Sequence, residues 1–185
     1  TAEELGGAKT HTSKSSVADA AYDNDIIVLK QVRRFFDFIP LNNTDKCPTI
    51  KVYDSIYRSE NSLDTLVPQN PNTPYDMKEL ILKIADENDF FEIQKEFARN
   101  ILVGFIRING STVGVVANQP MVLAGCLDID SSRKAARFVR FCDAFELPIL
   151  TFVDVPGFLP GTSQEYGGVI KHGAKLLFAY AEATV

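Results

Sequence analysis

Cysteine is scarce in this sequence, and no run of apolar residues is long enough to span a bilayer. The three cysteines, Cys47, Cys126 and Cys142, lie far apart, so their spacing indicates neither a metal site nor a disulfide framework. We expect reduced thiols in a reducing compartment, which is the cytoplasm or, in a eukaryote, the mitochondrial matrix. We therefore expect no metal site and no membrane segment.

An excess of positive charge is also missing. The 185 residues include 19 Lys and Arg and 24 Asp and Glu, which gives a net charge of −5. A mildly acidic chain is a poor non-specific binder of nucleic acid, so we expect no nucleic-acid partner. The sequence starts without Met and stops directly after a helical pattern, so we expect an internal fragment of a longer protein.

The first 75 residues predict one helix between two irregular stretches. Residues 1–21 are rich in small and polar residues, which favours a loop. Apolar residues then recur at helical spacing, from a predicted cap at Asp23 to a predicted end at Pro40. Residues 40–75 hold five of the nine prolines and show no sustained periodicity, so we interpret them as a linker between two domains.

A second unit is predicted from Asp76 onward. Asp76 and Glu79 have the spacing of a helix capping box, and the apolar run at residues 90–93 predicts a short strand. The clearest local signal lies in residues 102–117, where two apolar stretches flank Asn109-Gly110. Both residues of an Asn-Gly pair tolerate positive φ, so this segment predicts a tight β-hairpin.

The remaining residues predict helices alternating with a strand. A helix is expected over residues 131–145, and the continuous apolar run at residues 149–153 predicts a strand covered on both faces. A long helix is expected over about residues 164–184, because Thr162 and Glu165 have capping-box spacing at its start. Hairpin, helix, buried strand and helix in this order predict an α/β domain with helices against a sheet.

The strand–loop–helix segment at residues 151–162 is the strongest candidate for a binding site. Ligand sites in α/β sheets gather where strand ends meet helix starts, because free N–H groups there favour negative charge. Gly157 and Gly161 allow close approach of the backbone, while Phe158 and Leu159 offer apolar walls. These properties predict a pocket for an anionic or carbonyl oxygen, but a rigid structural turn explains them equally well.

The candidate loop is one of a series of motifs in a fixed order along the chain. They are Leu5-Gly-Gly-Ala-Lys-Thr-His-Thr12, Val115-Val-Ala-Asn-Gln-Pro120, Gly125-Cys-Leu-Asp-Ile129, Ala135-Ala-Arg-Phe-Val-Arg-Phe-Cys-Asp-Ala-Phe145, Asp154-Val-Pro-Gly-Phe-Leu-Pro-Gly161, Gln164-Glu-Tyr-Gly-Gly168 and His172-Gly-Ala-Lys-Leu-Leu177. Together they resemble the carboxyltransferase subunits of biotin-dependent acyl-CoA carboxylases, of the propionyl-CoA carboxylase β-chain type. The resemblance covers essentially the whole chain and is weakest in residues 40–75.

This resemblance implies an α/β fold of the crotonase/ClpP-like carboxyltransferase type. Residues 1–39 would be the C-terminal end of an N-terminal domain, residues 40–75 a linker, and residues 76–185 the first half of a C-terminal domain. The activity implied is transfer of a carboxyl group from carboxybiotin to propionyl-CoA, which gives methylmalonyl-CoA. The implied partners are a biotin-carrier or biotin carboxylase subunit that carries the biotin, and further copies of the chain in a hexameric core.

The resemblance also points to site residues. Members of the family stabilise oxyanions with backbone N–H groups in two glycine–alanine loops, and both loops lie outside this chain. No catalytic residue is therefore assigned, and the fragment alone is expected to be inactive. Gly157, Phe158 and Leu159 are the best candidates for lining the biotin-side wall, followed by Gln164 and Tyr166.

The sequence departs from the family where Ser16 and Asp19 replace a glycine and a histidine, which puts the role of that loop in doubt. The positions that select the acyl chain length lie after Val185. Three other functions stay open: another acyl-CoA enzyme of the crotonase fold, a subunit of a biotin-dependent decarboxylase, or a non-catalytic assembly module.

Two groups of ionisable side chains admit both a functional and a plain interpretation. Glu165 and His172 are seven residues apart, so they would share a helix face, either as an acid/base pair or as a surface hydrogen bond. Basic residues on the predicted helix 131–145 either attract CoA phosphates or form a solvated face. These basic residues are Arg133, Lys134, Arg137 and Arg140. In both cases the plain interpretation is favoured.

Overall fold

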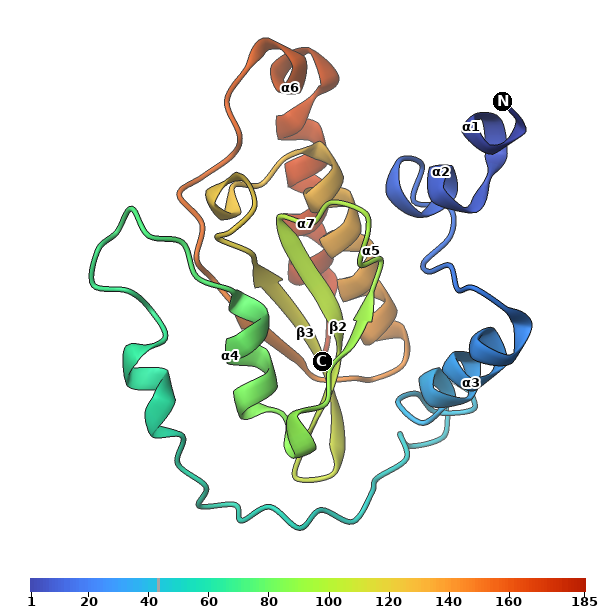
Figure 1. Ribbon diagram of the computed structural model, residues 1–185, viewed down its shortest axis with the longest axis vertical. Coiled ribbons are helices and arrows are strands. Elements are labelled where there is room, and N and C mark those ends of the chain that lie inside the picture. Colours follow the sequence, from blue (N-terminus) through green and yellow to red (C-terminus); the bar gives the residue numbers. More distant parts are fainter. Residues whose placement is uncertain (43) are drawn as a thin grey trace.

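The computed structural model describes residues 1–42 and 44–185. Its first part holds three helices, α1 (Ala2–Gly6), α2 (Ala8–Ser13) and α3 (Asp25–Phe36), which lie to one side of the rest of the molecule (Figure 1). The predicted loop over residues 1–21 is therefore wrong for residues 2–13, whereas residues 14–21 form no regular element. The Thr1 side chain accepts a hydrogen bond from the backbone N–H of Glu4 and completes a capping box, which satisfies free groups at the start of α1.

Helix α3 begins and ends close to its predicted limits. The side chain of Asn24, and not that of Asp23, caps it by accepting a hydrogen bond from the N–H of Ile27 at 3.0 Å. The helix ends at Phe36, before Pro40. α3, which is described throughout, contains no buried residue.

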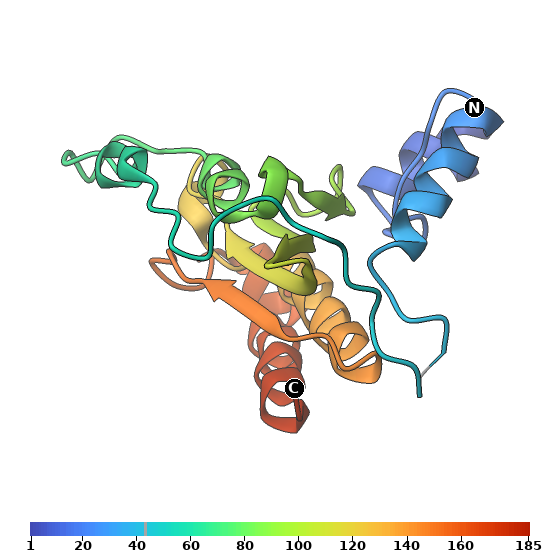
Figure 2. The ribbon, with the colours of Figure 1, turned by 90° about the horizontal axis from the view of Figure 1, so that it is seen from below.

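The predicted linker runs as an extended chain along the sheet unit (Figure 2). In the described part of residues 40–75, the one regular element is the short 3₁₀-helix η1 (Asn61–Thr65). This segment contacts the hairpin turn through the N–H of Ile50, which donates to the carbonyl of Gly110 at 3.1 Å. The division into an N-terminal domain, a linker and a C-terminal domain stays a prediction.

The sheet has the strand order β1-β2-β3-β4, formed by Phe91–Ile93, Ile101–Ile108, Ser111–Asn118 and Ile149–Phe152. The pairs β1–β2 and β2–β3 are antiparallel, and β3–β4 is parallel. Asn109 and Gly110 have φ values of 51° and 78°, which confirms the predicted hairpin turn. The last strand, predicted to be covered on both faces, is partly covered on each: Leu150 and Phe152 pack on one face and Ile149 on the other, while Thr151 is exposed.

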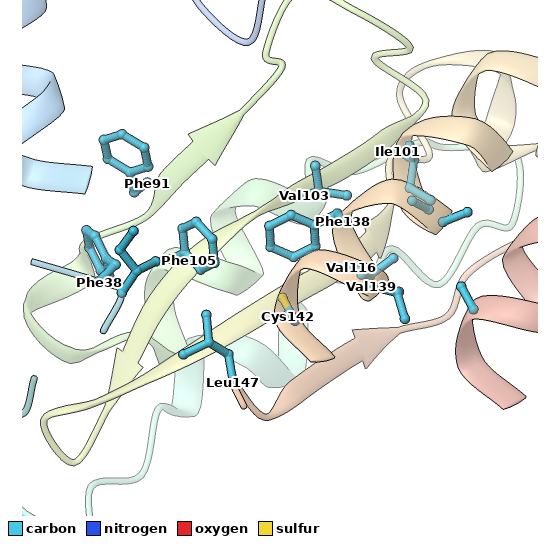
Figure 3. Close-up of a cluster of buried hydrophobic side chains, with 14 residues drawn as sticks. Phe38, Phe91, Ile101, Val103, Phe105, Val116, Phe138, Val139, Cys142 and Leu147 are labelled. Atoms are coloured by element: carbon cyan, nitrogen blue, oxygen red, sulfur yellow. The ribbon is translucent and has the colours of Figure 1, made fainter. Parts of the chain in front are cut away.

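Helices cover both faces of the sheet. Alternate β2 residues point to opposite sides: Val103 and Phe105 pack against α5 (Ile129–Ala144), while Leu102 and Ile106 pack on the side of α4 (Met77–Ile84). Helix α7 (Val169–Glu182) packs against α5. Figure 3 shows the larger cluster, in which Phe38 lies beside Phe105 and Phe91, so the segment after α3 shares the core of the sheet unit.

The ends of α4 and α5 depart slightly from prediction. Asp76 caps α4 as predicted, but its side chain accepts from the N–H of Lys78 at 2.9 Å, and Glu79 pairs with Lys83 instead of closing a capping box. Asp128 caps α5 and forms a capping box with Ser131.

The last predicted helix is two helices. α6 (Thr162–Gly167) and α7 are separated at Gly168, which has a left-handed φ of 85°. The position before α6 is occupied by Gly161 with a φ of 136°, so Thr162 does not act as the predicted cap. Glycine tolerates the left-handed conformation, so Gly168 divides the single helix that was predicted over about residues 164–184. Among the residues that the structure describes, no helix has the length and apolar character needed to cross a bilayer.

Candidate functional site

Two loops lie side by side at the carboxyl ends of the parallel strands β3 and β4. We call them the paired loops: residues 119–128 follow β3, and residues 153–161 follow β4. Because β3 and β4 are parallel, both loops leave the same edge of the sheet. The N–H of Leu127 donates to the carbonyl of Gly157 at 3.0 Å, and the N–H of Leu159 donates to the carbonyl of Leu127 at 2.7 Å. The candidate loop is therefore held by a neighbouring backbone.

Asn118, the last residue of β3, connects the paired loops through hydrogen bonds of its side chain. Its buried side-chain amide donates to the carbonyl of Gly125 at 3.0 Å, and its Oδ1 accepts from the N–H of Asp154 at 3.2 Å. Gly125 has a φ of 73°, and a Cβ at this position would lie 2.6 Å from the carbonyl oxygen of Asp154. Only glycine fits this close approach without a shift of the backbone.

Two further amides anchor the first of the paired loops. Asn100 donates to the carbonyl of Cys126 at 2.8 Å and to Oδ1 of Asp128 at 3.2 Å. Gln119 donates to Oδ1 of Asp76 at 2.7 Å. The sequence contained Asn118 and Gln119 within a matched motif, but it gave them no role, and Asn100 was missed altogether. Their signal is a buried amide beside the end of a strand, and a single sequence does not reveal that burial.

The predicted site residues Gly157, Phe158 and Leu159 all lie on the paired loops. Gly157 is exposed, and a Cβ added to it would meet no atom within 4 Å. The Phe158 side chain is 43% exposed, and one edge of its ring lies against Gly173 of α7, where a Cβ would come within 2.5 Å of the ring. Leu159 is half-buried. Gly157 and Phe158 are thus accessible and are not embedded in the core.

The other two predicted residues differ from each other. Oε1 of Gln164 accepts from the N–H of Ile129 at 3.1 Å, so this side chain caps the first turn of α5. Tyr166 lies on α6 and is 88% exposed. The structure therefore gives Gln164 a definite structural contact and leaves Tyr166 accessible.

His172 does not share a helix face with Glu165, because the break at Gly168 places the two residues on different helices. That prediction is wrong. Nδ1 of His172 is buried and has no hydrogen-bond partner among the described residues. Burial lowers the pKa of His172, and the cations of Lys175 and Arg133 lower it further, so the ring is neutral at neutral pH.

The basic residues of α5 divide into two groups. Arg137 forms an ion pair with Asp19 at 2.7 Å, and Arg133 pairs with Asp130 at 3.4 Å, so these arginines occupy an ion-paired surface. Asp19, where the sequence departs from the family, therefore has a partner. The lining of a cavity of about 630 Å³ beside them includes the carboxylate of Glu182, apolar residues and five cationic side chains, which are Arg133, Lys134, Arg137, Arg140 and Lys175.

Lys134 is not part of the solvated face, which corrects the sequence interpretation. It is 3% exposed, and its Nζ donates to the carbonyls of Phe97 at 2.7 Å and Ile101 at 2.8 Å. A third, longer bond of 3.3 Å reaches the carbonyl of Ala98. Burial lowers the pKa of Lys134 to about 8. The side chain fixes the turn that leads to Asn100.

The thiols show no sign of activation. Burial raises the pKa of the Cys142 thiol to about 12 and also raises the pKa of Cys47. Within residues 1–42 and 44–185, no group of three or more His, Cys, Asp or Glu side chains is arranged to hold a metal ion. Neither Cys47 nor Cys142 lies on the paired loops, whose accessible surface includes the backbone of Gly157 and the ring of Phe158.

The sequence and structure match one group of known proteins. The family described as the carboxyl transferase domain matches residues 1–185. The chain is 76% identical to the propionyl-CoA carboxylase beta chain of Roseobacter denitrificans over 184 residues, and this covers 100% of the chain and 36% of the relative. It is 52% identical over 185 residues to the methylmalonyl-CoA decarboxylase subunit alpha of Veillonella parvula, with the same shares of 100% and 36%.

A solved structure agrees with these relatives. The crystal structure of transcarboxylase 12S with hydrolysed methylmalonyl-coenzyme A bound, described as a hexamer assembly, superposes with a TM-score of 0.97 at 44% identity. The match covers 100% of this chain and 36% of that chain, so the chain spans about a third of the length of the proteins it resembles. The predicted crotonase-like carboxyltransferase fold is confirmed.

Proposed function

Since this chain belongs to the carboxyl transferase domain family, we propose that the longer protein transfers a carboxyl group from carboxybiotin to propionyl-CoA. The products are biotin and methylmalonyl-CoA. The observation that carries this proposal is the 76% identity to a propionyl-CoA carboxylase beta chain across 100% of the chain. The near-identical fold of transcarboxylase 12S, solved with hydrolysed methylmalonyl-coenzyme A, supports the same acyl-CoA chemistry.

The paired loops are the part of the site that this chain supplies. When bound, biotin provides the carboxyl group, and its fused rings have apolar faces and a polar urea edge. The exposed ring of Phe158 suits an apolar face, and the open backbone at Gly157 suits close approach of a polar edge. Leu159 extends the apolar surface, and Tyr166 is an accessible side chain on α6. Gln164 acts indirectly, because it caps α5 beside the paired loops.

The chain alone is inactive under this proposal. Residues 1–39 close an N-terminal domain, residues 40–75 link it to the next, and residues 76–185 begin a C-terminal domain. The backbone donors that stabilise developing oxyanions belong to the rest of the longer protein. Two candidates within the described residues do not replace them: Glu165 and His172 are on different helices, and the Cys142 thiol is buried.

The partners follow from the same reaction. A biotin-carrying or biotin carboxylase subunit brings the biotin, and further copies of the protein form a hexameric core, as in the hexamer named for transcarboxylase 12S. Exposed apolar side chains on α7, namely Ile170, Leu177 and Phe178, suit burial in such an assembly. The proposed location is the cytoplasm, or the mitochondrial matrix in a eukaryote.

The reverse half-reaction tests the activity with one protein. Full-length protein is incubated with free biotin and methylmalonyl-CoA, and propionyl-CoA is followed by chromatography. We expect propionyl-CoA to appear only when biotin is present, and we expect none from the chain of 185 residues. A full-length protein that shows no biotin-dependent transfer, or that hydrates an enoyl-CoA instead, contradicts the proposal.

A decarboxylase is the second candidate, because the chain is 52% identical to a methylmalonyl-CoA decarboxylase subunit alpha. The partner decides between the two. A complex that carboxylates propionyl-CoA with ATP and bicarbonate is a carboxylase. A complex that releases carbon dioxide from methylmalonyl-CoA without ATP is a decarboxylase.

A further inference from the structure

Asp154 is the point at which three segments of the chain meet. Its carboxylate accepts a hydrogen bond from the hydroxyl of Tyr75 at 2.7 Å, across 79 positions of sequence. Its N–H donates to Oδ1 of Asn118 at 3.2 Å. Its carbonyl lies against Gly125, where a Cβ would come within 2.6 Å. The second of the paired loops therefore starts from a residue that is fixed on three sides.

Tyr75 donates from a well-fixed position. Its ring packs against the apolar cluster around Ile81 on the α4 side of the sheet. The following residues are held by Gln119, which donates to Asp76 at 2.7 Å and accepts from the N–H of Met77 at 3.2 Å. A donor held in this way restrains its acceptor more than a mobile surface side chain does.

The bond between Tyr75 and Asp154 is charge-assisted. Burial, followed by the hydrogen bond and the negative charge of Asp154, raises the pKa of Tyr75 to about 12. The hydroxyl therefore keeps its proton and remains a donor throughout the neutral range. A neutral donor on a carboxylate gives a stronger hydrogen bond than two neutral partners do.

The loop after Asp154 needs such a restraint. Gly157 and Gly161 have φ values of 152° and 136°, and neither has atoms within 4 Å of an added Cβ. Glycines in open space allow many backbone conformations. Pairing with Leu127 restrains the middle of the loop, and Asp154 restrains its start.

We propose that Tyr75 is a positioning residue for biotin binding and acts through Asp154 on the loop that carries Gly157 and Phe158. This inference rests on the proposed function of that loop. Tyr75 belongs to the segment predicted as a linker between domains. The predicted linker therefore does more than connect two domains, because its last residue positions the loop that lines the proposed biotin site.

The test compares two identical substitutions in the full-length protein. Tyr75→Phe removes the donating hydroxyl and keeps the ring. Tyr57→Phe is the matched control, because Tyr57 lies in the same segment and is 86% exposed. The Michaelis constants for free biotin and for methylmalonyl-CoA are measured in the biotin-dependent formation of propionyl-CoA, together with kcat and the melting temperature.

Tyr75→Phe is expected to raise the Michaelis constant for biotin roughly three- to tenfold, as the loss of one hydrogen bond does. The Michaelis constant for methylmalonyl-CoA, kcat at saturating biotin and the melting temperature stay as in the wild type, and Tyr57→Phe changes none of these. Asp154→Asn keeps an acceptor and has the smaller effect, whereas Asp154→Ala matches or exceeds Tyr75→Phe. Adding Tyr75→Phe to Asp154→Ala gives no further rise.

Three results overturn the proposal. The first is a wild-type biotin constant in Tyr75→Phe. The second is an equal rise in both Michaelis constants with a lower melting temperature, which marks a purely structural role. The third is an additive effect of Tyr75→Phe on Asp154→Ala. An active wild type with an unaffected Tyr75→Phe rejects this inference alone, whereas a wild type without biotin-dependent transfer rejects the proposed function and this inference with it.

Discussion

Two amphipathic helices of the molecule are covered to very different extents. Helix α5 buries a full face, including Phe138, Val139 and Cys142, against the sheet and α7. Helix α3, which is described over its whole length, buries none of its residues, and Ile26 and Leu29 are 68% and 63% exposed. Since an apolar stripe on a helix normally faces a partner, we infer that α3 is completed by parts of the longer protein. The sheet unit is built around a core to which α3 contributes only the partly buried Phe35.

Removing a ring from the core should give the largest effect. Phe105 is 1% exposed, and its ring lies within 6.1 Å of the rings of Phe35, Phe38, Phe138 and Phe141. Phe105→Ala is expected to lower the free energy of unfolding of the chain by about 4 kcal/mol, because it leaves a cavity. Urea denaturation measures the loss. A loss below about 1 kcal/mol would contradict the view that Phe105 lies in a well-packed core.

Removing a buried cation should come next. Lys134→Met keeps the length of the side chain but leaves the carbonyls of Phe97 and Ile101 without their donor. We expect a loss of about 3 kcal/mol in the free energy of unfolding. Arg140→Met, at an exposed position of the same helix, is the control and should change it by less than about 0.5 kcal/mol. Equal losses for both variants would show that the contacts of Lys134 do not stabilise the fold.

The pH dependence of stability should reveal His172. Its pKa is lowered in the folded chain, so between that value and its ordinary 6.5 the unfolded chain binds more protons. Stability therefore falls as the pH drops through 6.5 toward the folded pKa. His172→Gln should flatten this part of the curve, whereas His11→Gln, on helix α2, serves as the control for the substitution. The measurement is the melting temperature at several pH values between about 5 and 8, the range in which histidine titrates. An unchanged slope in His172→Gln would contradict the lowered pKa of His172.

A change on the open face of α3 should have the smallest effect. Leu29→Ser is expected to alter the stability of the isolated chain by less than about 0.5 kcal/mol, because the side chain stays 63% exposed in the folded chain. In the full-length protein the same change should cost more, since the partner surface is then present. Denaturation of both forms checks this difference. An equal loss of unfolding free energy in the two forms would contradict the inference that α3, unlike α5, is covered only in the longer protein.

The elements that were predicted correctly are those encoded by neighbouring residues. Asn109-Gly110 determines its own turn, and the apolar spacing of α5 determines which face it buries. The break at Gly168 was missed because a glycine pair is compatible with a continued helix as well as with a left-handed stop. The helices in residues 1–21 were missed because small polar residues carry weak propensity and the decisive signal was the cap at Thr1.

The candidate site residues were identified from the sequence for the same reason, and their role in binding stays a prediction. Gly157, Phe158 and Leu159 are adjacent in sequence, so one motif identified them together. The side chains that hold their loop are distant: Asn118 is 36 positions from Asp154, and Tyr75 is 79 positions away. Burial of Lys134 likewise depends on carbonyls more than 30 positions earlier. Such contacts depend on the folded arrangement, and local patterns do not encode them.

The position of β4 at the rim of the sheet has a practical consequence for handling the chain. One side of β4 pairs with β3, and within the described residues its other side presents main-chain N–H and C=O groups to solvent. Val153, directly after it, is 73% exposed. A bare rim of this kind recruits strands from other molecules. Concentrated solutions of the chain should therefore aggregate by pairing at the free edge of β4. A charged residue in place of Val153 should reduce this aggregation.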